Sequence, residues 1–271
     1  MIKAANSFAL FGSRAVMYES LLPLNLRAHY SLYGEPDQNW QFIINHDDNL
    51  HNLRYFPVLQ QLNKDGFVLL NYVTKPNNLT KAMLWRMLPI FFGDFNFVFC
   101  RDCDSLLTPR QARCVLNFIR SGQIAHGIND NEQHSIPLMG GMVGFNCIEF
   151  KKMFSLHSFE EMLKLCGYSE DSWDIHGTDQ KFLMEHIWPK VSTSSIIDNC
   201  RDKTLYPEVT LPNEAVIKTG DTFTNYIGAC GLSSSLLTHA NPNTIVIDFY
   251  NEHGNKNFCD YLTKIERSLL A

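Results

Sequence analysis

The sequence predicts an α/β fold with a mostly parallel central sheet flanked by helices. Short apolar runs alternate along the chain with stretches of helical periodicity, and this alternation indicates βα units. One of the runs, Phe95–Cys100, leads directly to two aspartates, Asp102 and Asp104. Ligands of open α/β sheets bind beyond the carboxyl ends of the strands, so this pair marks the expected site.

Candidate strands and helices alternate through the first half of the chain. Each strand is an apolar run that ends at a breaker or at polar residues: Gly12 follows the first, and Asp47 follows the second. Pro23 and Pro57 predict interruptions within two of the helices. The predicted strands are Ser7–Phe11, Trp40–Asn45, Phe67–Val73 and Phe95–Cys100, and the predicted helices are Tyr18–Tyr30, Asn49–Leu62 and about Lys81–Leu88.

Helix-capping signals organise the second half. Thr108 as N-cap, Pro109 at the first helical position and Gly122 as the stop predict one helix. A capping box at Ser158–Glu161 opens a second. The other expected elements are a strand or loop at Ile124–Ile128, a glycine-rich run at Ser135–Asn146, a helix capped by Thr178 and ending at Trp188, a strand at Thr244–Tyr250 and a helix at Asn257–Leu270.

Composition limits the classes of function. The net charge of −5 comes without a basic stripe, which argues against nucleic acid as a main partner. The 8 cysteines are scattered, so we expect no disulfide scaffold and a reducing, cytoplasmic location. No apolar run approaches the ~18 residues of a membrane span, and no signal peptide is visible. We expect a single domain over residues 1–271, with halves 1–105 and 106–271.

Asp102 and Asp104 lie two residues apart, so their side chains point the same way if the strand continues. Two carboxylates ~4 Å apart repel by about 4 kcal/mol at an effective dielectric constant near 20. A divalent cation removes this repulsion, and hard oxygen ligands suit Mg²⁺ or Mn²⁺. The pair therefore predicts a metal site for a diphosphate, and the alternative is an acidic turn that caps the next helix.

Two arginines near this strand are candidates for phosphate contacts. Arg86 lies in the preceding helix, and arginine suits bidentate contacts with phosphate, although a surface arginine is the alternative. Arg101 directly precedes Asp102 and would face away from the aspartates in a regular strand. Cys100 and Cys103 form a C-x-x-C, but no second pair exists for zinc, so we interpret their spacing as chance.

Polar residues also gather in the loops of the second half. His126 and His134 bracket a loop that contains Asp130, next to the glycine-rich run. These residues either line a polar pocket, with His134 as a substrate contact, or are ordinary loop residues. His239 lies in a later loop as a candidate metal ligand, with a surface histidine as the alternative.

His176, Asp179 and Gln180 lie where a loop meets a helix. The helix dipole alone explains an aspartate in a first helical turn. The functional interpretation is that Asp179 or Gln180 faces the reacting group and that His176 contacts the substrate.

Three segments carry a family resemblance: FVFCRDCDSLLTPRQARCVLNFIRSG, AHGINDNEQHSIPLMGGMVGFN and HGTDQKFLMEHIWP. They contain R-D-x-D-S before an arginine-rich helix, then G-G-M-x-G, then G-x-D-Q-x-F-L. Together with the first strand and Gly12, the strand that ends at Asp47, and Trp85-Arg86, they resemble nucleotide-sugar glycosyltransferases of the GT-A fold over about residues 7–190. These enzymes are of the bacterial or viral type that makes polysaccharides and glycans. The resemblance implies a metal-dependent enzyme that moves a sugar from a UDP or GDP type of donor to a glycan or other hydroxyl acceptor.

The resemblance also implies roles for the nucleotide end of the site. Asp102 would contact the donor ribose or the metal, and Asp104 would ligate the metal, commonly Mn²⁺. Gly12 and Asp47 would lie near the nucleotide base, and Arg86 would neutralise phosphate.

At the sugar end, Gly140 and Gly141 would line the donor sugar and the acceptor. Asp179 and Gln180 match a D-Q pair that some retaining members place beside the anomeric carbon. If the enzyme inverts instead, Asp179 or Asp130 would take the proton of the acceptor. The residues do not decide between these two outcomes.

Two other classes of function stay open. The related loop often reads M-R-D, whereas this chain has Ile128-Asn129-Asp130. The missing arginine keeps open a catalytically silent binder or scaffold for nucleotide sugars as an alternative. A strand followed by D-x-D and serine is also similar to haloacid-dehalogenase-type phosphatases, although these usually place the motif on the first strand. Nucleotide-sugar turnover and phosphate release separate the three classes.

Overall fold

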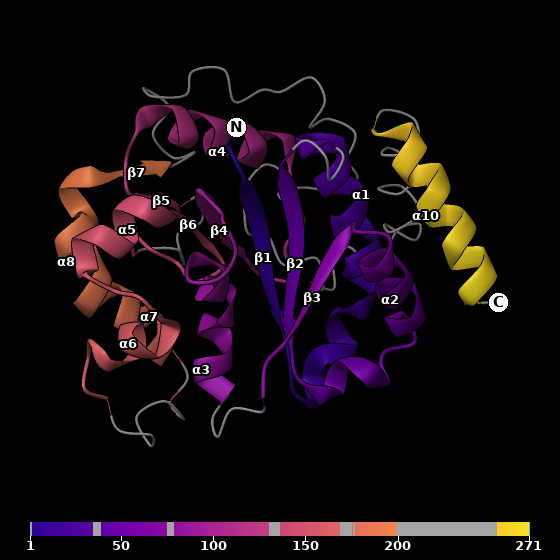
Figure 1. Cartoon of the computed structure of the whole chain (residues 1–271), viewed down its shortest axis with the longest axis horizontal. Helices are drawn as coiled ribbons and strands as arrows, with labels where there is room; N and C mark the ends of the chain where they lie inside the picture. The colour runs from indigo at the N-terminus through magenta and orange to yellow at the C-terminus, as the bar shows by residue number, and fades with distance from the viewer. Residues whose placement is uncertain are drawn as a thin grey trace, which may run out of the picture.

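The computed structural model describes residues 2–34, 39–74, 79–129, 136–168, 175, 177–198 and 254–270. Within these ranges the strands form one 7-stranded sheet in the order β3-β2-β1-β4-β6-β5-β7 (Figure 1). The strands are β1 (Ala4–Leu10), β2 (Trp40–His46), β3 (Val68–Tyr72), β4 (Phe97–Arg101), β5 (Ala125–Ile128), β6 (Met142–Asn146) and β7 (Ser195–Asp198).

Most neighbouring strands are parallel, as predicted. β1 is parallel to β2 and β4, β2 to β3, and β5 to β7. β6 is the exception, because it runs antiparallel to both β4 and β5. Met142 at the start of β6 pairs with Arg101 at the end of β4. This reversal brings the glycines that precede β6 to the carboxyl end of β4, where the acidic pair begins.

Two layers of helices cover the sheet. One hydrophobic cluster joins β1, β2 and β4 to the first layer, and a second joins β4 and β6 to the other layer. The first layer contains α1 (Leu22–Tyr33), α2 (Phe56–Lys64), α4 (Pro109–Ser121) and α10 (Lys256–Leu269). The second contains α3 (Leu79–Met83), η4 (Leu84–Ile90), α5 (Cys147–Phe154), α6 (Phe159–Lys164), α7 (Thr178–Phe182), η6 (Leu183–Ile187) and α8 (Trp188–Val191).

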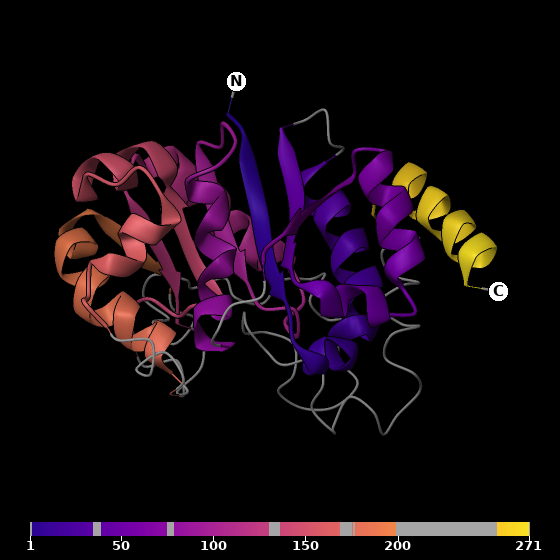
Figure 2. The same cartoon turned by 60° about the horizontal axis from the view of Figure 1, so that its bottom comes forward.

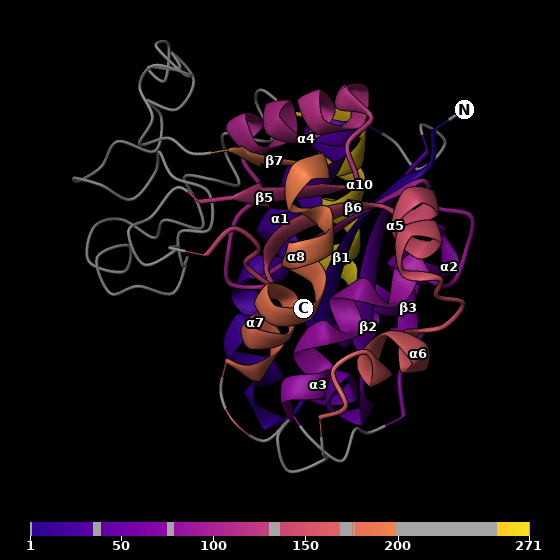
Figure 3. The ribbon, with the colours of Figure 1, turned by 90° about the vertical axis from the view of Figure 1, so that its left-hand side faces the viewer.

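The figures show how this arrangement divides the molecule. In Figure 2, α1, α2 and α10 gather beside β1 to β3, while α5 to α8 gather at the other end of the sheet. Figure 3 shows α4 running along β5 and β7. The C-terminal helix therefore returns to the half that the N-terminal residues build, because its buried face of Phe258, Cys259, Leu262 and Ile265 packs into the first hydrophobic cluster.

Most predicted elements are confirmed, with shifted ends. The predicted helix Tyr18–Tyr30 begins as the 3-10 segment η1 (Ser13–Leu21), and α1 follows with Pro23 in its first turn. The predicted helix Asn49–Leu62 is divided into η3 (Asp48–Asn52) and α2, which begins just before Pro57. The Thr108 side chain accepts a hydrogen bond from Gln111 N at 3.2 Å, as its predicted capping role requires.

Three details differ from the predictions. Gly177, with φ of 86°, is the N-cap of α7, whereas Thr178 is its first residue and donates its hydroxyl to Ile175 O at 2.7 Å. Helix α5 was not predicted, although Asn146 caps it by accepting from Glu149 N at 3.3 Å. β7 was not predicted either, because only four residues form it. The predicted strand Thr244–Tyr250 lies outside the described residues.

Candidate functional site

Arg86 joins two carboxylates that are far apart in the sequence. It lies in η4 and is 5% exposed. Its Nη1 forms an ion pair with Asp102, its Nη2 lies 3.8 Å from Asp179 Oδ2, and its Nε donates to Met83 O at 2.8 Å. Asp102 follows β4 and Asp179 lies in the first turn of α7. The fold thus gathers three predicted site residues from three separate segments.

Gly140 and Gly141 lie against the same three side chains. A Cβ atom on Gly141 would overlap the carboxylate of Asp102. A Cβ atom on Gly140 would lie 3.0 Å from Arg86 Nη2 and 3.1 Å from Asp179 Oδ2. Neither glycine has a positive φ, so space rather than backbone conformation limits the side chain here, severely at Gly141 and slightly at Gly140. We call Arg86, Asp102, Gly140, Gly141 and Asp179 the Arg86 cluster.

Burial and charge oppose each other within the Arg86 cluster. Burial raises the pKa of the Asp179 carboxyl above its ordinary value, and Arg86 only partly offsets this rise. Burial pulls the pKa of Arg86 down, but the carboxylates of Asp102 and Asp179 outweigh it, so that pKa is raised. Arg86 is therefore a fixed cation, whereas Asp179 holds a proton more readily than a solvated aspartate does.

Asp102 and Asp104 flank Cys103 in a turn, in which Ser105 N donates to Asp102 O at 3.3 Å. The Asp102 side chain is 36% exposed, and Asp104 is half-buried. The Cys103 thiol is buried and donates to Ala9 O at 3.4 Å, and burial raises its pKa. Because this thiol stays protonated, the two carboxylates are the groups of this turn that could hold a metal ion.

The acidic pair fits Mn²⁺ or Mg²⁺ as part of a coordination shell. Both ions prefer carboxylate oxygens, and the partly exposed Asp102 carboxylate is accessible from outside the core. Within the described ranges, no group of three or more His, Cys, Asp or Glu residues could hold a metal ion. Further ligands would therefore come from substrate, water or parts of the chain outside these ranges, such as the predicted His239.

Gly12 and Asp47, predicted to lie near the nucleotide base, are in contact at the ends of β1 and β2. Gly12 N donates to Asp47 Oδ2 at 3.0 Å. Asp47 also accepts from Asn49 N at 3.0 Å and from Asn49 Nδ2 at 2.9 Å. With three hydrogen bonds already accepted, the buried Asp47 carboxylate fixes the shape of this loop. Gly12, with φ of 68°, adopts a conformation that favours glycine.

Of the remaining predicted residues, the structure describes Arg101 and Gln180. Arg101 is 2% exposed, and its guanidinium lies over the Phe99 ring, in the layer opposite Arg86. Gln180 is half-buried and follows Asp179 in α7. The predicted residues Asp130, His134, His176 and His239 lie outside the described residues.

Sequence reasoning missed two contributions to this region. Tyr18 of η1 lies beside the acidic pair: burial raises its pKa, and Asp104 raises it further. Only its position after Gly12, at the carboxyl end of β1, could have suggested this. His126 pairs through Nε2 with Asp198 Oδ2 at 2.7 Å, and both residues are buried. No local pattern links these two, because Asp198 belongs to the unpredicted β7.

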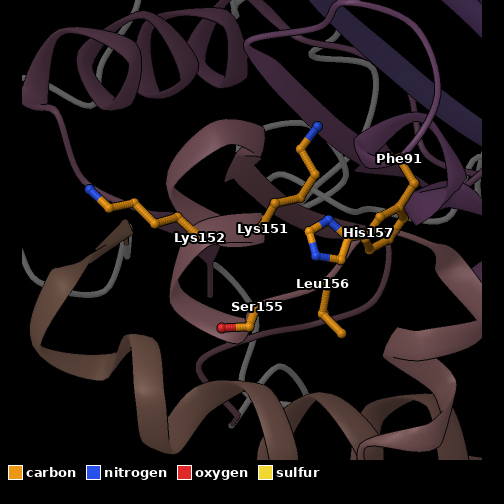
Figure 4. A pocket seen from close by; sticks show the side chains of 6 residues that line it. All are labelled: Phe91, Lys151, Lys152, Ser155, Leu156 and His157. Carbon is orange, nitrogen blue, oxygen red and sulfur yellow. The ribbon is translucent and has the colours of Figure 1, made fainter.

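A separate hollow of about 460 Å³ opens beside α5, away from the Arg86 cluster (Figure 4). Helix α5 begins where Cys147 N bonds Asn96 O, at the end of β4 opposite Asp102. Lys151 and Lys152 point in different directions in Figure 4. The hollow contains none of the predicted site residues; it is lined by Phe91, Lys151, Lys152, Ser155, Leu156 and His157.

No protein-family model matches the sequence, and no curated protein matches it either. Among solved structures, the glycosyltransferase GlyE of Streptococcus pneumoniae aligns at 10% identity with a TM-score of 0.54, over 97% of this chain and 64% of that chain. TarS 1–349 of S. aureus aligns at 13% identity with a TM-score of 0.45, over 74% and 59% of the two chains. A Bacillus anthracis glucose-1-phosphate thymidylyltransferase aligns at 12% identity, with a TM-score of 0.44, over 73% and 87%.

The chain therefore spans less than two thirds of the length of GlyE and of the TarS fragment. The likeness to GlyE confirms the predicted GT-A fold, with its mixed sheet and flanking helices. No helix in the part of the chain that the structure describes has the length and apolar character needed to cross a bilayer.

Proposed function

We propose that the chain is a metal-dependent glycosyltransferase, which moves a sugar from a nucleotide-diphosphate sugar to a glycan or other hydroxyl acceptor. The observation that carries this proposal is the Arg86 cluster. It places Asp102 of the D-x-D turn and Asp179 of the D-Q pair on one buried cation, at the carboxyl end of β4. That edge of an open α/β sheet is where ligands bind.

The acidic pair would hold the donor end of the reaction. Asp102 and Asp104 would bind Mn²⁺ or Mg²⁺, and such an ion stabilises the negative charge of a leaving diphosphate. Arg86 was predicted to neutralise phosphate directly. In the structure its three nitrogens contact Asp102, Asp179 and Met83 O, so we also assign it to holding the two carboxylates in place.

In the transfer step, the bond between the anomeric carbon and the diphosphate oxygen breaks, and a bond from the acceptor oxygen to that carbon forms. The diphosphate leaves with the electron pair, and the acceptor hydroxyl loses its proton. In an inverting reaction Asp179 would take that proton, for which its raised pKa suits it. In a retaining reaction Gln180 would face the anomeric carbon. The backbone at Gly140 and Gly141, which packs against these side chains, would line the donor sugar and the acceptor.

Gly12 and Asp47 would shape the loop that receives the nucleotide base, with a UDP or GDP type of donor. The Asp47 carboxylate, which accepts from Gly12 N and from Asn49, would order this loop. The neighbouring backbone would then contact the base.

A thermal-shift panel of UDP, GDP, CMP and dTDP sugars, each with and without Mn²⁺, tests the proposal. A ligand that binds only the folded state stabilises it by about 2.7 kcal/mol at a hundredfold excess over its Kd. We expect a shift with one type of base, dependent on Mn²⁺ and lost in Asp104→Asn. Asp94→Asn is the matched control, because the Asp94 side chain is 92% exposed and pairs only with Lys3 in the described residues.

The same panel separates the competing functions. No shift with any nucleotide would contradict the proposal. Phosphate release from a simple phosphate ester would support the phosphatase instead. A Mn²⁺-dependent shift without turnover on any acceptor would support a silent binder of nucleotide sugars.

A further inference from the structure

Arg101, the last residue of β4, is a buried arginine that the proposed mechanism does not use. Its residue is 2% exposed, and its Nη1 donates to Cys100 O at 3.1 Å. Its Nε and Nη2 are buried and have no hydrogen-bond partner among the described residues. A buried charge of this kind costs free energy unless its surroundings compensate it. A buried arginine beside Asp102 is therefore expected to have a structural or functional role.

The surroundings of Arg101 are polar and come from several elements. Its guanidinium lies 5.4 Å from the centroid of the Phe99 ring, a cation–π contact. Tyr33 of α1 lies beside the guanidinium, and burial raises the pKa of Tyr33 to about 12, although Arg101 opposes this rise. The neutral phenol can accept a hydrogen bond from the guanidinium. Helix α1 thus places a buried polar group, the Tyr33 hydroxyl, beside the charge at the end of β4.

The carboxylate of Asp102 acts on the Arg101 charge from the next position in the chain, and a second buried carboxylate, Asp198, is linked to Arg101 through His126, which interacts with both. His126 Nε2 bonds to Asp198 Oδ2 at 2.7 Å, and the His126 ring stacks on Phe118 at 5.2 Å. Burial lowers the pKa of His126 despite Asp198, and Arg101 adds to the lowering. A neutral His126 that donates through Nε2 leaves its Nδ1 as an acceptor, and this atom is buried without a partner in the described residues.

Gly144 makes this approach possible across β6. It lies between Phe99 and His126 in the strand register, and a Cβ atom on Gly144 would overlap the Phe99 ring. Without that atom, the Phe99 ring lies 6.5 Å from the His126 ring. Arg101, Phe99, His126 and Asp198 thus form a continuous path from β4 to β7.

At the end of β4, the side chains of Arg101 and Asp102 point toward opposite helix layers. Asp102 meets Arg86 of η4, and Arg101 meets the layer that contains α1 and α4. We propose that Arg101 is a positioning residue: its guanidinium, flanked by Tyr33 and the His126–Asp198 pair, fixes the end of β4 so that Asp102 meets Arg86. Only the purpose of this positioning rests on the proposed transferase function.

Labelling of native cysteines with N-ethylmaleimide, read by peptide mass spectrometry, tests the proposal without any nucleotide. Cys103 lies inside the acidic turn and is buried, whereas the buried Cys147 and Cys259 lie in α5 and α10. We expect Arg101→Met to raise the labelling rate of Cys103 at least tenfold relative to Cys147 and Cys259. Asp198→Asn should act in the same direction, and it serves as the decisive variant if Arg101→Met does not fold.

Leu62→Ala is the matched control, because Leu62 is buried in α2 and belongs to the hydrophobic cluster that also contains Cys103. It should raise the Cys103 and Cys147 rates by one common factor, since global opening exposes both thiols. The proposal is overturned if Arg101→Met and Asp198→Asn also raise all three cysteines equally.

The nucleotide provides a second readout. If the wild-type protein binds a nucleotide with Mn²⁺, Arg101→Met should weaken that binding about tenfold, although Arg101 lies in the layer opposite Arg86. Binding of wild-type strength in a folded Arg101→Met protein would contradict the positioning role. If the wild-type protein binds no nucleotide, the transferase proposal fails, and the cysteine labelling still decides the role of Arg101.

Discussion

Replacing Gly141 by alanine tests the Arg86 cluster most sharply, because the added methyl group would overlap a single side chain, Asp102. The alanine Cβ would overlap the Asp102 carboxylate, whereas the backbone conformation at Gly141 accepts alanine. Since ordinary contacts between heavy atoms are about 3.5 Å, the carboxylate must move by roughly 1 Å or more. A displacement of that size near reacting groups costs about 10²-fold in rate. We therefore expect a loss of about a hundredfold in turnover.

Gly140→Ala is the matched comparison. Its Cβ would lie 3.0 Å from Arg86 Nη2 and 3.1 Å from Asp179 Oδ2, so these neighbours need to shift by only a few tenths of an ångström. We expect it to reduce turnover less than Gly141→Ala does. Overpacking costs about 1–3 kcal/mol in stability, so both variants should remain folded in a thermal melt.

The assay is release of nucleoside diphosphate from the donor that the thermal-shift panel identifies, with Kd and kcat measured separately. Gly141→Ala should weaken Mn²⁺-dependent nucleotide binding as well as turnover, because it displaces Asp102. A Gly141→Ala protein with wild-type binding and turnover would show that the Asp102 position seen here does not matter for function.

Three further predictions concern single side chains. Asp179→Ala should spare donor binding and reduce kcat, and full activity would remove Asp179 from the site. Arg27 Nη2 lies 2.6 Å from Glu266 Oε2 in an ion pair whose arginine is buried. Glu266→Gln leaves the buried Arg27 charge without its carboxylate, so it should lower the free energy of unfolding by about 3 kcal/mol. Urea melts measure this loss, with exposed Glu160→Gln as the control. Burial lowers the pKa of His29 to about 3, so the unfolded chain binds the extra proton below pH 6.5. Stability should then fall on acidification from pH 6.5 toward 3, by up to about 1.4 kcal/mol per pH unit, and His29→Asn should flatten that slope.

The Arg86 cluster shows how far sequence alone reaches. Each of its members was a predicted site residue: Arg86 as a candidate phosphate contact, and the others because D-x-D, G-G and D-Q are local motifs. Their convergence could be expected only through the family resemblance. The contacts of Arg86 with two carboxylates were not predicted, since they depend on packing of η4 against β4 and α7. No local pattern encodes such a three-body contact.

The elements that sequence reasoning missed are short or lack a periodic signal. β7 has only four residues, three of them half-buried, so it carries little alternation of apolar and polar positions. Helix α5 follows β6 directly, with Asn146 as both the last strand residue and the N-cap. In the sequence, no breaker therefore marks where the glycine-rich run Ser135–Asn146 ends and α5 begins. The His126–Asp198 pair, which depends on β7, was hidden for the same reason.

The most direct test of the central claim is donor turnover. The protein is incubated with the nucleotide sugar that gives the largest thermal shift, with and without Mn²⁺, and released nucleoside diphosphate is measured for the wild-type protein and Asp104→Asn. We predict release that requires Mn²⁺ and is lost in Asp104→Asn. Release that persists unchanged in Asp104→Asn, or no release from any donor with Mn²⁺ present, would contradict the assignment of the acidic pair to a glycosyltransferase site.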